Sequence, residues 1–160
     1  MYKTKIDLSD KVRRNVVVIL NDRLAEAIDL HSQVKQAHWN VKGPNFIALH
    51  ELFDKISDVV SEQVDMIAER VTALGGTAEG TVEVVARRSK LKIYPLSITS
   101  GRDHLLYLST QVSTFGRAVR SAIDDTEELG DKDTADLFTQ VSRELDKYLW
   151  FLEAHLQDKG

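Results

Sequence analysis

Two of the five histidines in this 160-residue chain flank a short turn. His38 and His50 lie on either side of residues 40–45, Asn-Val-Lys-Gly-Pro-Asn, where two stretches of helical periodicity meet. A short turn between antiparallel helices brings the two imidazoles close together. Because imidazole nitrogen is a common ligand of transition metals, this pair predicts part of a metal site.

Three carboxylates follow His50 on the second stretch at spacings that place them on one helix face. With a rotation of about 100° per residue from His50, Asp54 lies at about 40°, Asp65 at about 60° and Glu69 at about 100°. The apolar stripe of this helix centres roughly 120° away, so the four side chains face away from the helix-bundle core. His50 and Asp65 are about 22 Å apart along the axis, so one chain cannot bring all four to one ion.

A second copy of the chain resolves this separation. The residue numbers of the pairs His50/Glu69 and Asp54/Asp65 have the same sum. If two copies of this helix cross antiparallel about a two-fold axis near residues 59 and 60, His50 therefore lies opposite Glu69 of the other copy, and Asp54 lies opposite its Asp65. An isologous dimer then carries two identical sites, each with His38 beside His50. Two imidazoles and up to three carboxylates suit Fe(II), which binds nitrogen and oxygen ligands and leaves positions open for an oxidant.

Other interpretations of these residues stay open at this point. Carboxylates on a helix surface are usually solvated, and a histidine near a helix end often packs or caps it. Zinc accepts the same ligands as iron but has no redox chemistry, so a competing zinc site is an alternative. A plain helical oligomer is a further alternative.

Composition bounds the class of protein that carries these residues. With 25 acidic and 21 basic residues the net charge is −4, which argues against tight DNA binding by the whole surface. The chain has no cysteine, so a metal must be held by histidine and carboxylate side chains. No apolar run approaches the roughly 18 residues of a membrane span, and no signal-peptide core is present. We expect one cytoplasmic domain over residues 1–160, with residues 1–9 as a short tail.

Four long amphipathic helices must position the candidate site. Apolar residues at helical spacing predict helices over about residues 10–39, 44–75, 105–130 and 137–152. Short turns join the first two and the last two, so each pair forms an antiparallel hairpin. Residues 77–100 are long enough to cross along the bundle, but their periodicity does not decide between strand, short helix and irregular structure. The fold class is therefore all-α, a four-helix bundle with a long crossover connection.

Several segments together resemble a known family. Residues 35–54, KQAHWNVKGPNFIALHELFD, are followed by DMIAERVTALGG, YPLSI and DKYLWFLEAHL. From about residue 20 to 156 the chain resembles the Dps family of mini-ferritins, DNA-protection proteins of starved bacteria. The resemblance implies a ferritin-like bundle with a short extra helix in the long connection, and a dodecameric shell built from isologous dimers.

The resemblance also implies an activity and its residues. Members oxidise Fe(II), preferentially with hydrogen peroxide and otherwise with oxygen, and store the ferric product as a mineral. The ferroxidase sites are shared across two-fold interfaces, with His38, His50 and Asp54 from one subunit and Asp65 and Glu69 from the mate, and each holds up to two iron ions. Independently, the chain contains no Glu-x-x-His motif, which favours an interfacial site over one inside the bundle.

Weaker assignments follow from the same resemblance. Trp39 corresponds to a tryptophan beside the site that takes up stray oxidising equivalents, although a packed aromatic at a helix end is an equal alternative. Asp133 and Asp136 align with a pore through which iron enters, although helix capping and the helix dipole also favour aspartates there. His31 shares the face of His38, and we expect it to support the site or the fold rather than to bind metal.

DNA is expected to be a weak partner. Relatives that condense DNA carry a mobile lysine-rich tail, whereas the segment before the first helix has only Lys3 and Lys5. Twelve copies at −4 each carry about −48, which repels DNA except at these tails. The alternative function is a mainly structural, nucleoid-associated DNA-binding protein in which the metal chemistry is minor.

Overall fold

The computed structural model describes residues 1–157 and contains five helices in that part of the chain. Four are long: α1 (Asp10–Asn40), α2 (Phe46–Ala73), α4 (Gly101–Glu128) and α5 (Lys132–Ala154). The short helix α3 (Val82–Arg88) lies within the connection between α2 and α4. Apart from an isolated bridge between Lys42 and Ser100, these helices are all the regular structure of the described residues.

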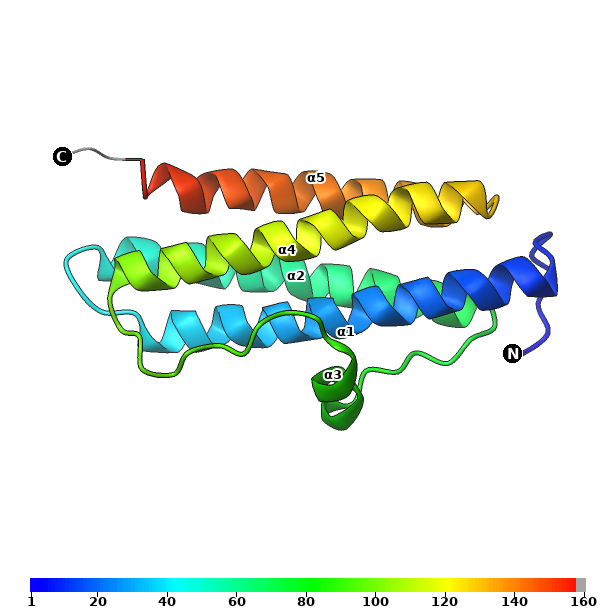
Figure 1. Ribbon diagram of the computed structural model, residues 1–160, viewed down its shortest axis with the longest axis horizontal. Coiled ribbons are helices and arrows are strands. Elements are labelled where there is room, and N and C mark those ends of the chain that lie inside the picture. Colours follow the sequence, from blue (N-terminus) through cyan, green and yellow to red (C-terminus); the bar gives the residue numbers. More distant parts are fainter. Residues whose placement is uncertain (158–160) are drawn as a thin grey trace.

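The long helices form two antiparallel hairpins packed side by side (Figure 1). α1 packs mainly against α2, and α4 mainly against α5. The segment between α2 and α4 runs back along α1 for the length of the bundle, with α3 midway, so α2 and α4 point in the same direction (Figure 1). The predicted pair of hairpins and the crossover are confirmed, and so is the short helix that the resemblance implied in the connection; the rest of the connection is irregular.

Local signals in the sequence explain where the helices begin and end. Ser9 caps α1 by accepting a hydrogen bond from the backbone N–H of Val12, as the start signal predicted. After α2 the chain turns at Gly75, whose φ of 86° lies in the left-handed region. A Cβ on Gly75 would lie 2.5 Å from the backbone oxygen of Tyr2, so both the backbone angle and the space require glycine.

A continuous apolar core fixes the rotation of each helix about its axis. Its largest buried side chains include Phe53 from α2, Phe115 from α4 and Phe138 from α5, all fully buried. Burying each of these rings contributes roughly 1.5–3 kcal/mol, so rotating α2 out of register would be costly. The opposite face of α2, which carries the candidate ligands, is therefore held outward.

No helix within residues 1–157 is long and apolar enough to cross a membrane.

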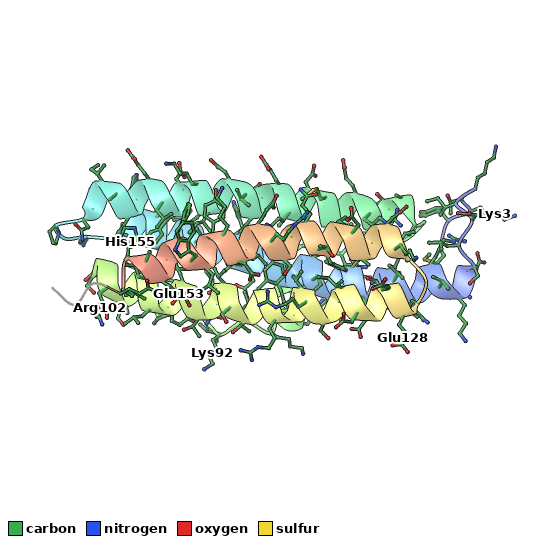
Figure 2. The ribbon with its side chains drawn as sticks, turned by 90° about the horizontal axis from the view of Figure 1, so that it is seen from above. Lys3, Lys92, Arg102, Glu128, Glu153 and His155 are labelled. Atoms are coloured by element: carbon green, nitrogen blue, oxygen red, sulfur yellow. The ribbon has the colours of Figure 1, made fainter. Side chains whose placement is uncertain are left out.

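The segment before α1 folds back onto the end of α2 instead of extending freely. The backbone N–H of Tyr2 donates to the carbonyl of Gly75 at 2.7 Å, and Arg13 donates to the carbonyl of Leu74 at 2.8 Å. Ile6 and Leu8 pack against the core. The side chains of Lys3 and Lys5 are exposed, and Figure 2 shows Lys3 extending away from that end of the bundle.

Candidate metal centre

His38 and His50 form a reciprocal pair across the α1–α2 turn. Nδ1 of His38 lies 2.8 Å from the backbone oxygen of His50, and Nδ1 of His50 lies 2.8 Å from the backbone oxygen of His38. The two rings stack, with centroids 3.7 Å apart and an angle of 21° between their planes. Each helix thus supplies both an imidazole and the carbonyl that orients the imidazole of the other helix.

This arrangement selects the tautomer that can bind a metal. A carbonyl oxygen accepts hydrogen bonds and cannot donate them, so Nδ1 of each neutral ring must carry the proton. The lone pair then lies on Nε2 in both rings, and the hydrogen bond from Nδ1–H to the backbone carbonyl holds each ring in place. Metal-bound histidines are commonly oriented by such a hydrogen bond from the nitrogen that does not bind the metal. His38 and His50 are therefore prepared to act as two nitrogen ligands side by side.

Asp54 lies next to the histidine pair, but a lysine currently neutralises it. Its Oδ1 is 3.8 Å from Nε2 of His38 and 2.8 Å from the ammonium of Lys35. The hydrogen bond from Lys35 lowers the pKa of Asp54, with further help from the charges of Lys35 and the two histidines and against the effect of burial. Asp54 is thus ionised at neutral pH and faces a cation already.

Asp65 and Glu69 are exposed on the same helix but are not brought to the histidines. They lie 15 and 19 residues after His50, which on a straight helix is about 22 and 28 Å along the axis. Within residues 1–157 of a single chain, no group of three or more His, Asp or Glu side chains is close enough to hold an ion. The two groups of predicted ligands are thus separated along α2, and their combination across two copies stays a prediction.

The two neighbouring side chains on α1 have different environments. Trp39 is 67% exposed and is not packed into the bundle; Nζ of Lys35 lies 5.9 Å from its ring centroid. His31 is partly buried, and burial together with the positive charge of Lys35 lowers its pKa, against the effect of Asp58. His31 is therefore neutral at pH 7, on the face that leads to His38.

The aspartates at the start of α5 divide into a cap and an exposed pair. Asp131 is buried, accepts from the backbone N–H of Thr134, and pairs with Arg70 of α2 at 2.7 Å. Asp133 and Asp136 are exposed, and together with Glu69 they line an open hollow of about 370 Å³ between α2 and α5. Helix capping accounts for Asp131. The predicted pore residues Asp133 and Asp136 instead share a surface with the predicted iron ligand Glu69.

Two features of the site did not emerge from the sequence pattern. Lys35 was not singled out, although it lies three residues before His38 and so on the same helix face. The backbone carbonyls of His38 and His50 were also missed, because only the positions of the two helices in space make the exchange visible. The sequence did contain a signal for Lys35, because it is a positively charged residue at helical spacing from the candidate ligand His38.

The fold and the site first define a class. Four long helices with a lengthwise crossover connection are the architecture of a ferritin-like protein. Residues 17–159 match the family model described as the ferritin-like domain. This match spans most of the chain and agrees with the fold predicted from the sequence.

Individual relatives narrow the class further. A DNA protection during starvation protein of Agrobacterium fabrum is 51% identical over 159 residues, which cover 99% of this chain and 98% of that protein. The protein of the same name from Mycolicibacterium smegmatis is 34% identical over 153 residues, 96% of this chain and 83% of that one.

Solved structures give the same result. The tetragonal form of Mycobacterium smegmatis Dps matches with a TM-score of 0.94 at 33% identity, over 100% of this chain and 96% of that chain. The Dps protein of Vibrio cholerae O1, described as a member of a broad superfamily of ferritin-like diiron-carboxylate proteins, matches with a TM-score of 0.91 at 25% identity over 98% of each chain. The chain belongs to the Dps family of ferritin-like proteins.

Proposed function

We propose that this chain is a ferroxidase and iron-storage protein whose working site forms between two copies. The observation that carries the proposal is the reciprocal hydrogen bonding of His38 and His50, which leaves both Nε2 lone pairs free beside Asp54. A pair of locked imidazoles next to an ionised carboxylate supplies part of the ligand set that a transition metal needs. Asp65 and Glu69 of a second copy complete it, related by the two-fold axis that their spacing indicates.

In this mechanism Fe(II) is the substrate. The two Nε2 atoms bind the first ion, and Asp54 joins it when the ammonium of Lys35 is displaced. Asp65 and Glu69 of the second copy supply the negative charge that retains a second ion. Two Fe(II) ions then give one electron each to hydrogen peroxide, which takes up two protons and forms two water molecules. Because both electrons arrive together, no hydroxyl radical is released.

The ferric product is stored in the interior of a shell of twelve subunits. Asp133, Asp136 and Glu69 line one hollow, so carboxylates extend from the start of α5 to the predicted iron ligand Glu69. A positive ion that enters this hollow is attracted by all three. The relatives from Agrobacterium fabrum and Mycolicibacterium smegmatis are named DNA protection during starvation proteins. We infer that this chain protects DNA in the cytoplasm by removing Fe(II) and peroxide, the two reagents that damage it.

A second function, structural DNA binding, rests on the exposed lysines of the N-terminal segment. Lys3 and Lys5 are both exposed at one end of the bundle, where Lys3 projects from the surface (Figure 2). The segment that carries them is anchored to the end of α2 through Tyr2 and Gly75. An anchored segment with two lysines gives weak contact with DNA, so this function is secondary to iron oxidation.

Anaerobic Fe(II) loading followed by a pulse of peroxide tests the proposal. Ferric absorbance is followed in the native protein and in a His38→Ala/His50→Ala variant that still assembles. The native protein is expected to oxidise iron quickly, and the variant is expected to be slower by about 100-fold or more, since it lacks both nitrogen ligands. His155→Ala provides the matched control, because His155 is an exposed histidine just after α5 that lies near the α1–α2 turn but is not one of the predicted ligands (Figure 2).

The outcomes separate the candidate functions. Loss of rapid oxidation in the double variant alone supports the histidine site. Equally slow rates in all three proteins would contradict ferroxidase function and favour a structural role. Zinc is tested in the same preparation, because an inert ion with the same ligand preference should inhibit oxidation in competition with Fe(II).

A further inference from the structure

A tyrosine and a histidine form a buried pair beneath the metal-binding surface. The hydroxyl of Tyr94, from the connection, lies 2.5 Å from Nδ1 of His104 on α4. His104 is 1% exposed and Tyr94 is 8% exposed. The rings lie nearly parallel, at 19°, with centroids 6.0 Å apart. Neither residue takes part in the proposed iron site, and both can exchange protons.

The pair is joined to the metal-binding surface by one layer of packed residues. Phe53 of α2 is fully buried and contacts His104 edge to face, with centroids 6.3 Å apart. Phe53 directly precedes Asp54 in the chain and follows His50 by less than one helical turn. On α1, the backbone of Asn40, two residues after His38, lies close enough to His104 to influence its pKa. Both histidine-bearing helices therefore pack against this pair.

The protonation states of the pair are fixed by burial. Burial lowers the pKa of His104, against the opposing effects of the Asn40 backbone and Asp103, so the ring is neutral at pH 7. Burial also raises the pKa of Tyr94, with a smaller contribution from Tyr107, so the phenol keeps its proton. The phenol of Tyr94 therefore donates to a neutral Nδ1 of His104, and the ring proton lies on Nε2.

We propose that Tyr94 is an electron donor to the iron site and that His104 is the base that accepts its proton. The inference rests on the proposed ferroxidase function and adds a role when a site holds a single Fe(II). Hydrogen peroxide then needs two electrons, and one iron supplies only one. Tyr94 provides the second electron while its phenol proton moves along the existing hydrogen bond to Nδ1 of His104.

The step balances in atoms and charge. One Fe(II), one hydrogen peroxide, the neutral Tyr94–His104 pair and two protons from solvent give one Fe(III), two water molecules, the Tyr94 phenoxyl radical and the His104 imidazolium. The next Fe(II) that arrives returns an electron to Tyr94, and His104 returns the proton. The pair is thereby restored, and peroxide is reduced without release of a hydroxyl radical from half-loaded sites.

A neighbouring tyrosine shows why Tyr94 is the donor. Tyr107 contacts Tyr94 edge to face, with centroids 4.9 Å apart. Its hydroxyl donates to the backbone carbonyls of Lys92 and Ile93, at 2.9 and 2.7 Å. A carbonyl cannot take up the phenol proton, whereas the neutral imidazole beside Tyr94 can. Oxidation of Tyr107 would leave the proton without an acceptor, so the two rings form a natural matched comparison.

Freeze-quench electron paramagnetic resonance tests the proposal. The native protein is loaded with one Fe(II) per proposed site, mixed with peroxide and frozen, and ferric absorbance is recorded from the same mixture. A tyrosyl radical signal is expected, and growth on ring-deuterated tyrosine should narrow it, which separates it from a Trp39 radical. Tyr94→Phe should remove the signal, and Tyr107→Phe should retain it. His104→Gln accepts the hydrogen bond but not the proton, so the radical should form more slowly by about tenfold or more.

Each outcome decides between the two proposals. Iron oxidation with a radical that depends on Tyr94 supports the electron donor. Iron oxidation with no tyrosyl radical, or with one that survives in Tyr94→Phe, overturns the donor and leaves ferroxidase function intact. Absence of iron oxidation overturns both. If Tyr94→Phe does not fold, spin trapping of the native protein followed by peptide mass spectrometry decides the matter, since the adduct must lie on Tyr94.

Discussion

At the scale of single residues, the candidate site depends on main-chain atoms as much as on side chains. The carbonyls of His38 and His50 each fix the ring of the other residue, so neither histidine is oriented without its partner helix. Residue types and spacing were enough to select His38, His50 and Asp54 as a group. They were not enough to show which nitrogen faces outward, because that depends on the crossing of α1 and α2.

Lys35 allows a prediction about metal affinity. Its ammonium bonds to Asp54 at 2.8 Å, where a metal ion must compete with it and is also repelled by its charge. Replacing it in Lys35→Met keeps the aliphatic stem beside Trp39 and removes the charge. Fe(II) binding, measured by anaerobic titration calorimetry, is expected to tighten by about two- to fivefold, since Asp54 is exposed and the effect is screened.

A second lysine variant provides the control for this prediction. Lys55 is exposed on α2 one residue after Asp54, and Lys55→Met removes the same charge from the same region. Its effect on Fe(II) affinity should be smaller than that of Lys35→Met. Equal effects would mean that general charge, and not competition for Asp54, sets the affinity; weaker binding in Lys35→Met would contradict the competition altogether.

At the scale of helices, apolar spacing predicted the four long elements, whereas the short helix in the connection was implied by the family resemblance alone. Regular apolar spacing, Ser9 before α1 and Gly75 after α2 are local signals, and local signals determine where a helix begins and ends. Residues 77–100 have no such period, since the buried Val85, Leu91 and Tyr94 alternate irregularly with apolar side chains that stay exposed, Val82, Ile93 and Leu96. The docking of residues 1–9 was missed for a related reason, since its partners, Gly75 and Leu74, are distant in sequence.

The contact between α1 and α4 provides a prediction about pH. Glu26 on α1 is almost fully buried and pairs with Arg23, 2.7 Å away, which also reaches the Ala118 carbonyl of α4. Burial raises the pKa of Glu26, against the attraction of Arg23. A carboxyl with a raised folded-state pKa stabilises the fold fully below its unfolded value, about 4.5, and loses that contribution as pH rises through the folded value.

Glu26→Gln should remove this pH dependence, because an amide does not ionise. Thermal unfolding midpoints of the native protein and the variant are measured upward from pH 4.5. The unfolding midpoint of Glu26→Gln minus that of the native protein is expected to rise with pH. Loss of the ion pair with Arg23 shifts this difference at every pH but does not change the direction of its pH dependence. Glu62→Gln, at an exposed position of α2, should run parallel to the native protein. A constant difference for Glu26→Gln would refute the assignment.

At the scale of the whole molecule, net charge and the N-terminal segment determine how the protein meets DNA. The chain carries −4, so the proposed shell of twelve would carry about −48 and would repel a polyanion over most of its surface. The exposed Lys3 and Lys5 oppose this only locally, on a segment tied to α2 by Tyr2. Protection of DNA by removal of iron and peroxide needs no such contact.

Gel-shift titration with duplex DNA therefore should show no stable complex at about 150 mM salt, and a weak one at about 20 mM, because counterion release governs affinity. Lys3→Ala/Lys5→Ala is expected to weaken the low-salt complex and to reduce the salt dependence by about one power of salt concentration per lysine. Lys90→Ala/Lys92→Ala removes the same charge from exposed positions of the connection and should bind as the native protein does. A native complex that persists at about 150 mM salt would show that DNA binding is a principal function. If the Lys3→Ala/Lys5→Ala variant also kept that complex, a surface other than these two lysines would bind the DNA.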